Sequence, residues 1–286
     1  MTGVIRMSNG KALSKLTTYL FLALFGFMLI YPLLWMFFAT FKTNAEIFGS
    51  TTLLPAAYSF AAYLKGWVGA GQYTYATFFI NTFLLVIPTV FCTLLSCSVV
   101  AYGFARFTFP GKNLWFGLMI STLMLPNAVI IIPRYLIFNK LGWLDTYLPF
   151  IIPALFACYP FFIFMLVQFL RGIPRDLDEA ASIDGCGSTG IFFKILLPLM
   201  KPALFSAGLF QFMWTWNDFF DSLIYINSVK HYTLSLGLRI SLDAASAVPW
   251  DQVMAMSLIS ILPLIILFFF SQRYFIEGIA TSGLKG

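Results

Sequence analysis

FFINTFLLVIPTVFCTLLSCSVVAYGF, residues 78–104, decides the fold of this chain, because this long apolar run contains no charged side chain. A helix needs about 20 consecutive apolar residues to cross the hydrocarbon core of a bilayer. Lipid offers no hydrogen-bond partner to backbone groups, so a helix, which pairs those groups internally, is the expected form of the run. The stretch therefore predicts a membrane-spanning helix.

Five further stretches have a similar length and apolar character. The six predicted spans are 16–40, 78–104, 113–137, 147–170, 202–226 and 253–271. Prolines interrupt several of them, and such kinks are tolerated in membranes where neighbouring helices re-satisfy the freed backbone groups. The predicted fold class is therefore an all-α membrane protein, a packed bundle of six transmembrane helices.

The composition of the whole chain agrees with this fold class. Of its 286 residues, 60% are hydrophobic and only 10% are charged, whereas soluble domains carry about 25% charged residues. The mean hydropathy is +0.88. The net charge of +6 does not indicate a nucleic-acid partner, because the basic residues lie between apolar runs and form no stripe or module that enters a groove.

The basic residues also predict the orientation in the membrane. With the N-terminus inside, 11 of the 17 Lys and Arg residues fall on the inner face and 6 on the outer face. Since the more basic loops stay in the cytoplasm, both termini are predicted to be cytoplasmic. The predicted segments are a cytoplasmic stretch at 1–15, a first helix at 16–40, an extracytoplasmic loop at 41–77, a core domain at 78–275 with an inner loop at 171–201, and a cytoplasmic tail at 276–286.

The inner loop at 171–201, RGIPRDLDEAASIDGCGSTGIFFKILLPLMK, is the most patterned stretch outside the membrane spans. Asp176 and Glu179 have the spacing of a capping box, which begins a helix. Gly185 is suited to end that helix in the left-handed conformation, and Ser188 is suited to cap a second one. The loop therefore predicts two short helices joined by a glycine turn at the inner membrane face.

The same loop carries a resemblance to a known family. Its motif residues are Glu179, Ala180, Ala181, Asp184, Gly185, Ile195, Leu197 and Pro198. They resemble the EAA motif of the membrane subunits of ABC importers, which marks the coupling helix that docks in a cleft of a cytoplasmic ATPase. Small residues permit close approach of another subunit there, and Glu179 offers a charged anchor. A well-capped amphipathic loop explains Glu179 and Gly185 but not the Ile-Leu-Leu-Pro that follows.

The resemblance covers nearly the whole chain. YPLLWMFFATFKTNAEIF, AYGFARFTFPGK and the ending QRYFIEGIATSGLKG are similar to the carbohydrate branch of the ABC importers, especially the second membrane subunit of maltose-type transporters. This implies a bacterial inner-membrane protein that carries a sugar or oligosaccharide. It also implies a heterodimer with another membrane subunit, two ATPase subunits that use ATP and Mg, and an extracytoplasmic solute-binding protein. The chain itself is expected to bind no cofactor.

The fifth span predicts a polar face. At about 100° per residue, Gln211, Thr215 and Asp218 share one side, and Trp214 and Asn217 flank them. Acidic groups in a membrane helix usually face a bundle interior or an aqueous cavity, so these residues are the predicted solute path, with Trp214 stacking on a sugar ring. Polar helix packing and an interfacial aromatic belt explain the same pattern equally well. In maltose-type transporters the partner subunit makes most of the sugar contacts.

No catalytic or metal site is predicted. The chain has no GxxxxGK[ST] loop, so ATP hydrolysis is assigned to a partner, and one loop histidine, His231, with four scattered cysteines makes no catalytic or ligand set. One alternative is an importer of another small solute, such as glycerol phosphate or a polyamine. A second is an intramembrane enzyme, and a third is a receptor or scaffold, against which the resemblance of the inner loop argues.

Overall fold

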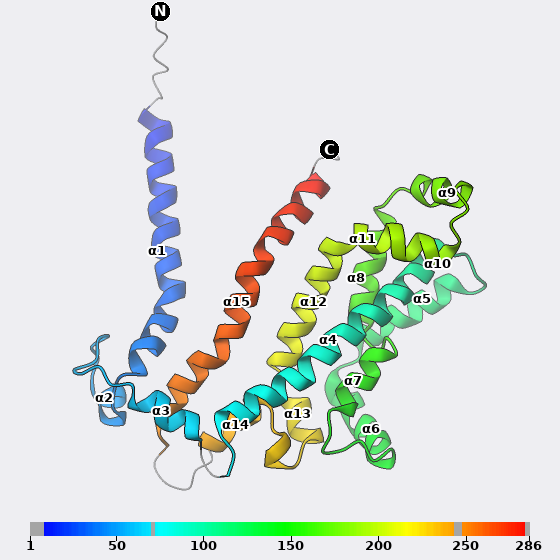
Figure 1. The fold of residues 1–286 in the computed structure, drawn as a ribbon. Coiled ribbons are helices and arrows are strands. Elements are labelled where there is room, and N and C mark those ends of the chain that lie inside the picture. The colour runs from blue at the N-terminus through cyan, green and yellow to red at the C-terminus, as the bar shows by residue number, and fades with distance from the viewer. Residues whose placement is uncertain (1–8, 70–71, 243–247, 284–286) are drawn as a thin grey trace, which may run out of the picture. The chain divides into compact units, whose positions relative to one another are not determined.

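The structure, a computed structural model, describes residues 9–69, 72–242 and 248–283, with side chains from residue 14 to residue 272 within those ranges. The described residues form helices, turns and loops with no strand (Figure 1), which confirms the all-α fold class. They divide into two compact units. One contains the residues up to Val68 and Ser241–Ile259, and the other contains residues 69–240 and the chain from Ser260 onwards.

The first unit carries the N-terminal helix. α1, Asn9–Ala39, contains the candidate membrane span Ser14–Ala39, whose most apolar window has none of its residues buried within the chain. α2 (Asn44–Gly49) and α3 (Ala61–Val68) follow it. The predicted outer loop at 41–77 therefore contains two short helices, and α1 leaves its surface for lipid or another subunit to cover.

The second unit is built around α4. Its helices are α4 (Tyr75–Arg106), α5 (Lys112–Ser121), α6 (Asn127–Lys140), α7 (Leu148–Leu155), α8 (Pro160–Arg171), α9 (Asp176–Ile183), α10 (Ser188–Ile191), α11 (Leu197–Leu199), α12 (Lys201–Trp216), α13 (Phe220–Tyr225) and α14 (Leu234–Leu242) up to residue 240. α4 packs against α7, α8 and α12 (Figure 1). The last helix, α15 (Trp250–Gly283), belongs to both units.

The candidate spans agree with the prediction in part. Four stretches are long and apolar enough to cross a membrane, and they are Ser14–Ala39, Tyr75–Arg106, Leu148–Arg171 and Trp250–Gln272. Two further pairs meet the test only together, because Lys112–Met124 and Asn127–Lys140 meet at 103°, and Ser188–Leu199 and Lys201–Trp216 at 74°. The described residues thus hold four candidate spans, or six if each bent pair is one broken span.

Proline divides two of the predicted spans. The span at 113–137 breaks at Pro126, which precedes the first residue of α6 with an extended backbone. The span at 147–170 is divided between α7 and α8, where Ala157 has φ +56° and Pro160 begins α8. A proline lacks the N–H that would continue the preceding helix. The stretch at 113–137 is therefore bent into two helices, whereas Leu148–Arg171 is a single candidate span that is interrupted between α7 and α8.

The span predicted at 202–226 also ends early. α12 stops at Trp216, and Asp218 then accepts backbone hydrogen bonds from Asp221 (3.3 Å) and Ser222 (3.0 Å). A carboxylate that accepts such bonds satisfies the free N–H groups at the start of a helix, here α13. Local capping therefore outweighs the apolar pattern, and the prediction of a continuous helix to residue 226 is wrong.

Within the segment predicted as a cytoplasmic tail, 276–286, α15 continues as a helix to Gly283. Residues 284–286 lie outside the described part of the chain.

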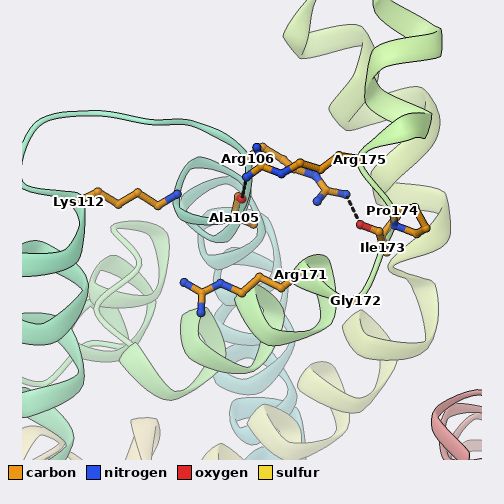
Figure 2. A pocket seen from close by; sticks show the side chains of 8 residues that line it. All are labelled: Ala105, Arg106, Lys112, Arg171, Gly172, Ile173, Pro174 and Arg175. Atoms are coloured by element: carbon orange, nitrogen blue, oxygen red, sulfur yellow. Dashed lines mark hydrogen bonds between the residues drawn. The ribbon is translucent and has the colours of Figure 1, made fainter. Parts of the chain in front are cut away.

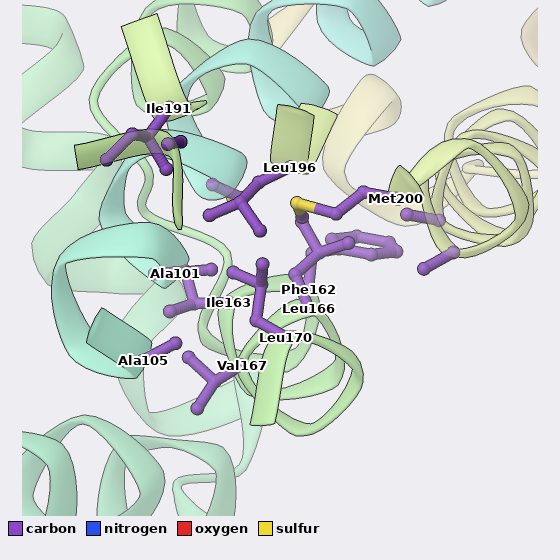
Figure 3. Packing of buried hydrophobic residues seen from close by; sticks show 14 residues of the cluster. Ala101, Ala105, Phe162, Ile163, Leu166, Val167, Leu170, Ile191, Leu196 and Met200 are labelled. Atoms are coloured by element: carbon purple, nitrogen blue, oxygen red, sulfur yellow. The ribbon is translucent and has the colours of Figure 1, made fainter. Parts of the chain in front are cut away.

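A cluster of buried apolar side chains supports the inner loop (Figure 3). On α8 the buried positions recur at helical spacing, and they are Phe162, Ile163, Leu166, Val167 and Leu170. Ala101 and Ala105 of α4 face this row, and small residues let membrane helices approach closely. Leu196 and Met200, from the end of the inner loop, are fully buried in the same cluster. The loop is thereby fixed to the α4–α8 pair.

Candidate functional site

The inner loop folds into two short helices, α9 and α10, joined by a glycine turn. Gly185 has φ +82°. The N–H of Cys186 donates to the carbonyl of Ala181 (2.9 Å), and the N–H of Gly185 donates to the carbonyl of Ser182 (3.1 Å). These two bonds form a Schellman motif. The prediction that Gly185 ends the first helix in the left-handed conformation is confirmed.

The starts of the two helices differ from the prediction. Asp176 is the first residue of α9 and follows Arg175, while Ser188 is the first residue of α10 and follows Gly187. No side chain caps either start, so the predicted capping box and the Ser188 cap are wrong. The acidic residues still lie in the first turn of α9, where the helix dipole favours negative charge.

Polar contacts attach the loop to α4. Nε of Arg106 lies 2.7 Å from Oδ2 of Asp178 on α9, and these side chains are only 7% and 19% exposed. The N–H is poorly aligned for a hydrogen bond, and Oδ1 of Asp178 has no hydrogen-bond partner among the described residues. Arg175 donates to a carbonyl near the end of α4 (3.2 Å), and Tyr102 donates to the carbonyl of Ser188 (3.0 Å). Both short helices are therefore linked to α4, through residues that sequence reasoning missed.

The motif residues divide between the core and the surface. Ala181 is buried in the cluster beneath the loop, and Ile195 and Leu197 are half-buried. The exposed motif residues are Glu179, Ala180, Asp184, Gly185 and Pro198. α9 therefore buries one side against the bundle and presents the Glu-Ala side outwards.

Ile183 lies on this exposed side of α9. Its side chain is 87% exposed, the highest fraction of any large apolar side chain among the described residues. Glu179 and Ala180 precede it by four and three residues, so the three side chains are neighbours on the helix surface. An apolar centre beside a charged rim is typical of a protein contact surface. Sequence reasoning gave Ile183 no role, although its position in the motif helix was visible.

A polar pocket lies at the end of α12. It has a volume of about 140 Å³, and its lining residues are Phe150, Tyr159, Gln211, Trp214, Thr215, Asp218 and Asp221. Four of the five residues predicted for the solute path are therefore brought together. The fifth, Asn217, is exposed and donates from its amide to the carbonyl of Met213 (2.8 Å). It lies outside the lining because α12 ends beside it.

The pocket offers several groups suited to a hydroxyl-rich solute. Gln211 is 2% exposed and donates to Oγ1 of Thr215 (2.9 Å), while its Oε1 has no hydrogen-bond partner among the described residues. A buried acceptor without a partner is costly, so a ligand hydroxyl at Oε1 would stabilise it. Trp214 is 49% exposed and packs at 5.0 Å on Phe161, which leaves part of the indole available for stacking.

A charged network borders the pocket on the α6 side. Arg134 lies 3.5 Å from Oδ2 of Asp221. The amide of Asn127 donates to Oδ1 of Asp221 (3.2 Å) and accepts from Arg134. Asp221 thus has two partners on α6, which position its carboxylate at the wall of the pocket.

The described residues contain no candidate site for a metal ion. No group of three or more His, Cys, Asp or Glu side chains lies close enough together to hold an ion. The four cysteines are free, and Nδ1 of His231 lies 3.4 Å from Oδ2 of Asp145.

The fold and the loop together define a class, helical membrane proteins that carry two short helices between two apolar helices, here α8 and α12. The chain belongs to the family described as the inner membrane component of binding-protein-dependent transport systems, which matches residues 94–281. It is therefore a membrane subunit of an ABC importer.

Several known proteins are similar to the chain over nearly all of its length. The arabinooligosaccharides transport system permease AraQ of Halalkalibacterium halodurans is 36% identical, over 99% of this chain and 100% of its own. The probable ABC transporter permease YurM of Bacillus subtilis is 34% identical, over 96% and 90%. A crystal structure of a bacterial ABC transporter involved in alginate import matches with a TM-score of 0.82 at 23% identity, over 94% and 98%, and shows the shared fold.

Proposed function

We propose that this chain forms part of the translocation path of an oligosaccharide importer and couples that path to a separate ATPase through the loop at 171–201. The observation that carries the solute class is the full-length similarity to permeases named for arabinooligosaccharides, at 36% and 32% identity. A further relative, 29% identical, is named for galactooligosaccharides. We therefore favour a sugar oligomer over glycerol phosphate or a polyamine.

The packing supports a direct mechanical route from the loop to the pocket. The exposed side of α9 receives the ATPase, and the Arg106–Asp178 ion pair passes its displacement to α4. α4 in turn packs closely on α12, where a Cβ added at Gly208 would lie 3.3 Å from Leu94. Since close-packed interiors transmit strain, a shift of α9 would reach the pocket on α12.

The size of the polar pocket supports a second membrane subunit. Small-molecule sites typically enclose about 300–1,000 Å³, whereas this pocket has about 140 Å³. One chain alone therefore does not enclose an oligosaccharide, and a partner subunit completes the path. The proposed assembly adds two ATPases, which bind ATP and Mg, and an extracytoplasmic binding protein. It lies in the bacterial plasma membrane with both termini of this chain in the cytoplasm.

The test is solute-stimulated ATPase activity and uptake by the complete transporter in proteoliposomes. We expect stimulation by an oligosaccharide-loaded binding protein. Gln211→Leu removes one hydrogen-bonding group from the pocket, which is worth about 1 kcal/mol, so the apparent solute affinity should fall roughly fivefold to tenfold. Ser206→Ala, on the same helix but outside the pocket, is the matched control. Stimulation by a polyamine or glycerol phosphate alone would contradict the proposed solute class.

A further inference from the structure

A second cavity, the basic pocket, lies between the end of α4, the start of α5 and the chain that follows α8 (Figure 2). It has a volume of about 370 Å³, and four cationic side chains line it together with residues 105 and 172–174. These side chains are Arg106, Lys112, Arg171 and Arg175. The cavity is separate from the polar pocket on α12 and shares no residue with it.

The basic pocket lies where three apolar helices end. Arg106 is the last residue of α4, Lys112 is the first of α5, and Arg171 is the last of α8. α4 and α8 are candidate membrane spans or parts of them, and α5 belongs to a bent pair. Basic residues at the ends of apolar spans lie at the level of the lipid headgroups. The cavity therefore opens at the depth where lipid phosphates lie.

The positive charge of the pocket is only partly neutralised. Within the described residues, Asp178 is the one carboxylate in an ion pair with any of the four cations, and its partner is Arg106. The other three cations have no carboxylate partner there. Lys112 donates to the carbonyl of Phe107 (2.7 Å), and Arg171 lies over the ring of Phe116 at 5.2 Å. A guanidinium carries five N–H donors, so donors remain for an anion, and an anion would relieve the repulsion among the cations.

An exposed apolar surface adjoins the pocket on α5. Leu114, Trp115 and Leu118 are 64%, 59% and 48% exposed, and they follow Lys112 within two turns of the helix. Tryptophan is enriched at the membrane interface. A ligand that joins an anionic head to an apolar tail matches both the pocket and this surface, whereas free phosphate matches the pocket alone.

We propose that the basic pocket binds the phosphate headgroup of an anionic phospholipid whose acyl chains lie along α5. Basic pockets between transmembrane helices are suited to such headgroups. The bound phosphate accepts hydrogen bonds from Arg171, Arg175 and Lys112. Arg106 and Arg175 also hold the inner loop, so the bound lipid braces the base of that loop. This inference does not depend on the identity of the transported solute.

The first experiment counts bound lipid. The complete transporter is reconstituted in nanodiscs of equal phosphatidylcholine and phosphatidylglycerol, extracted gently, and examined by native mass spectrometry. We expect the wild-type complex to retain phosphatidylglycerol, and Lys112→Gln with Arg171→Gln to retain less, roughly fivefold for each cation removed. Lys15→Gln with Lys140→Gln removes two exposed lysines elsewhere and is the matched control. Equal retention by both double variants would overturn the proposal.

A second experiment removes no charge, so it tests the proposal even if Lys112→Gln with Arg171→Gln fails to assemble. A photo-reactive residue replaces Trp115, and its cross-linked products are identified in the same nanodiscs. Preferential cross-linking to phosphatidylglycerol supports the proposal, including in the presence of millimolar inorganic phosphate. Equal yields with both lipids, a cross-link to the ATPase in place of lipid, or loss of the lipid product on adding phosphate would each overturn it.

Discussion

Gly185 provides a quantitative test of the inner loop. Its φ of +82° is a left-handed conformation, which costs a residue with a Cβ roughly 1–2 kcal/mol. A Cβ added there meets no heavy atom within 4 Å, so Gly185→Ala carries this conformational cost without a steric clash. A change of that size lowers the ratio of formed to unformed turn by a factor of about 5–30. The variant should therefore populate the formed turn less than the wild type, while the surrounding bundle stays folded.

A series of variants separates the effect of backbone strain from that of bulk. Gly185→Asn adds a side chain that tolerates the left-handed conformation, Gly185→Ala adds strain, and Gly185→Leu adds strain and bulk. Gly187→Ala is the matched control, because Gly187 has φ −71° and an equally open Cβ position. In proteoliposomes holding the complete transporter, we expect uptake per ATP hydrolysed to fall in the order wild type, Asn, Ala, Leu. Assembly should be unchanged.

Two results would refute this reasoning. Wild-type uptake by Gly185→Leu would show that the loop has no coupling role. A defect in Gly187→Ala that equals the defect in Gly185→Ala would show that the left-handed turn is not the cause.

Two further predictions concern charged contacts. Asp178→Ala leaves Arg106 without its carboxylate, so we expect the free energy of unfolding to fall by about 1.5–3 kcal/mol. In a double-mutant cycle with Arg106→Met, measured by thermal unfolding, the two effects should be non-additive. Strict additivity would contradict the ion pair. Partial desolvation raises the pKa of Asp145, but hydrogen bonds from Ser228 and its neighbours outweigh it and lower the pKa to about 2. The ionised Asp145 carboxylate therefore stabilises the fold above about pH 4, and this contribution is lost as the pH falls towards 2. Asp145→Asn should flatten the pH dependence of thermal unfolding in that window. An unchanged pH profile would contradict this role of Asp145.

The predictable features were those set by local sequence. Gly185 ends α9 because a glycine at that spacing satisfies the helix end by itself. Gln211 and Thr215 share a pocket because residues four apart lie on one face of a helix. Asn217 lies outside the pocket lining, because the predicted polar face was extended beyond Trp216, where α12 ends and Asp218 caps α13. The apolar pattern continues through the break between α12 and α13, so it did not predict that break.

Contacts between segments that are distant along the chain could not be predicted from the sequence. Arg106 lies just beyond the span predicted at 78–104 and Asp178 lies in the inner loop, and nothing in either stretch identifies the other residue as its partner. The basic pocket has the same origin, because the ends of α4, α5 and α8 come together only when the helices pack. Charge counts placed these residues on one face of the membrane, but they did not group them into a cavity.

The central claim, that the inner loop contacts the ATPase, is tested most directly by cross-linking from Ile183. This side chain is 87% exposed on α9, whereas Leu64, 72% exposed on α3, lies in the predicted outer loop and is the control position. With a photo-reactive residue at each site in the assembled transporter, we predict that position 183 cross-links to the ATPase and that position 64 does not. An ATPase product from position 64, or a product from position 183 with the binding protein and none with the ATPase, would contradict the account.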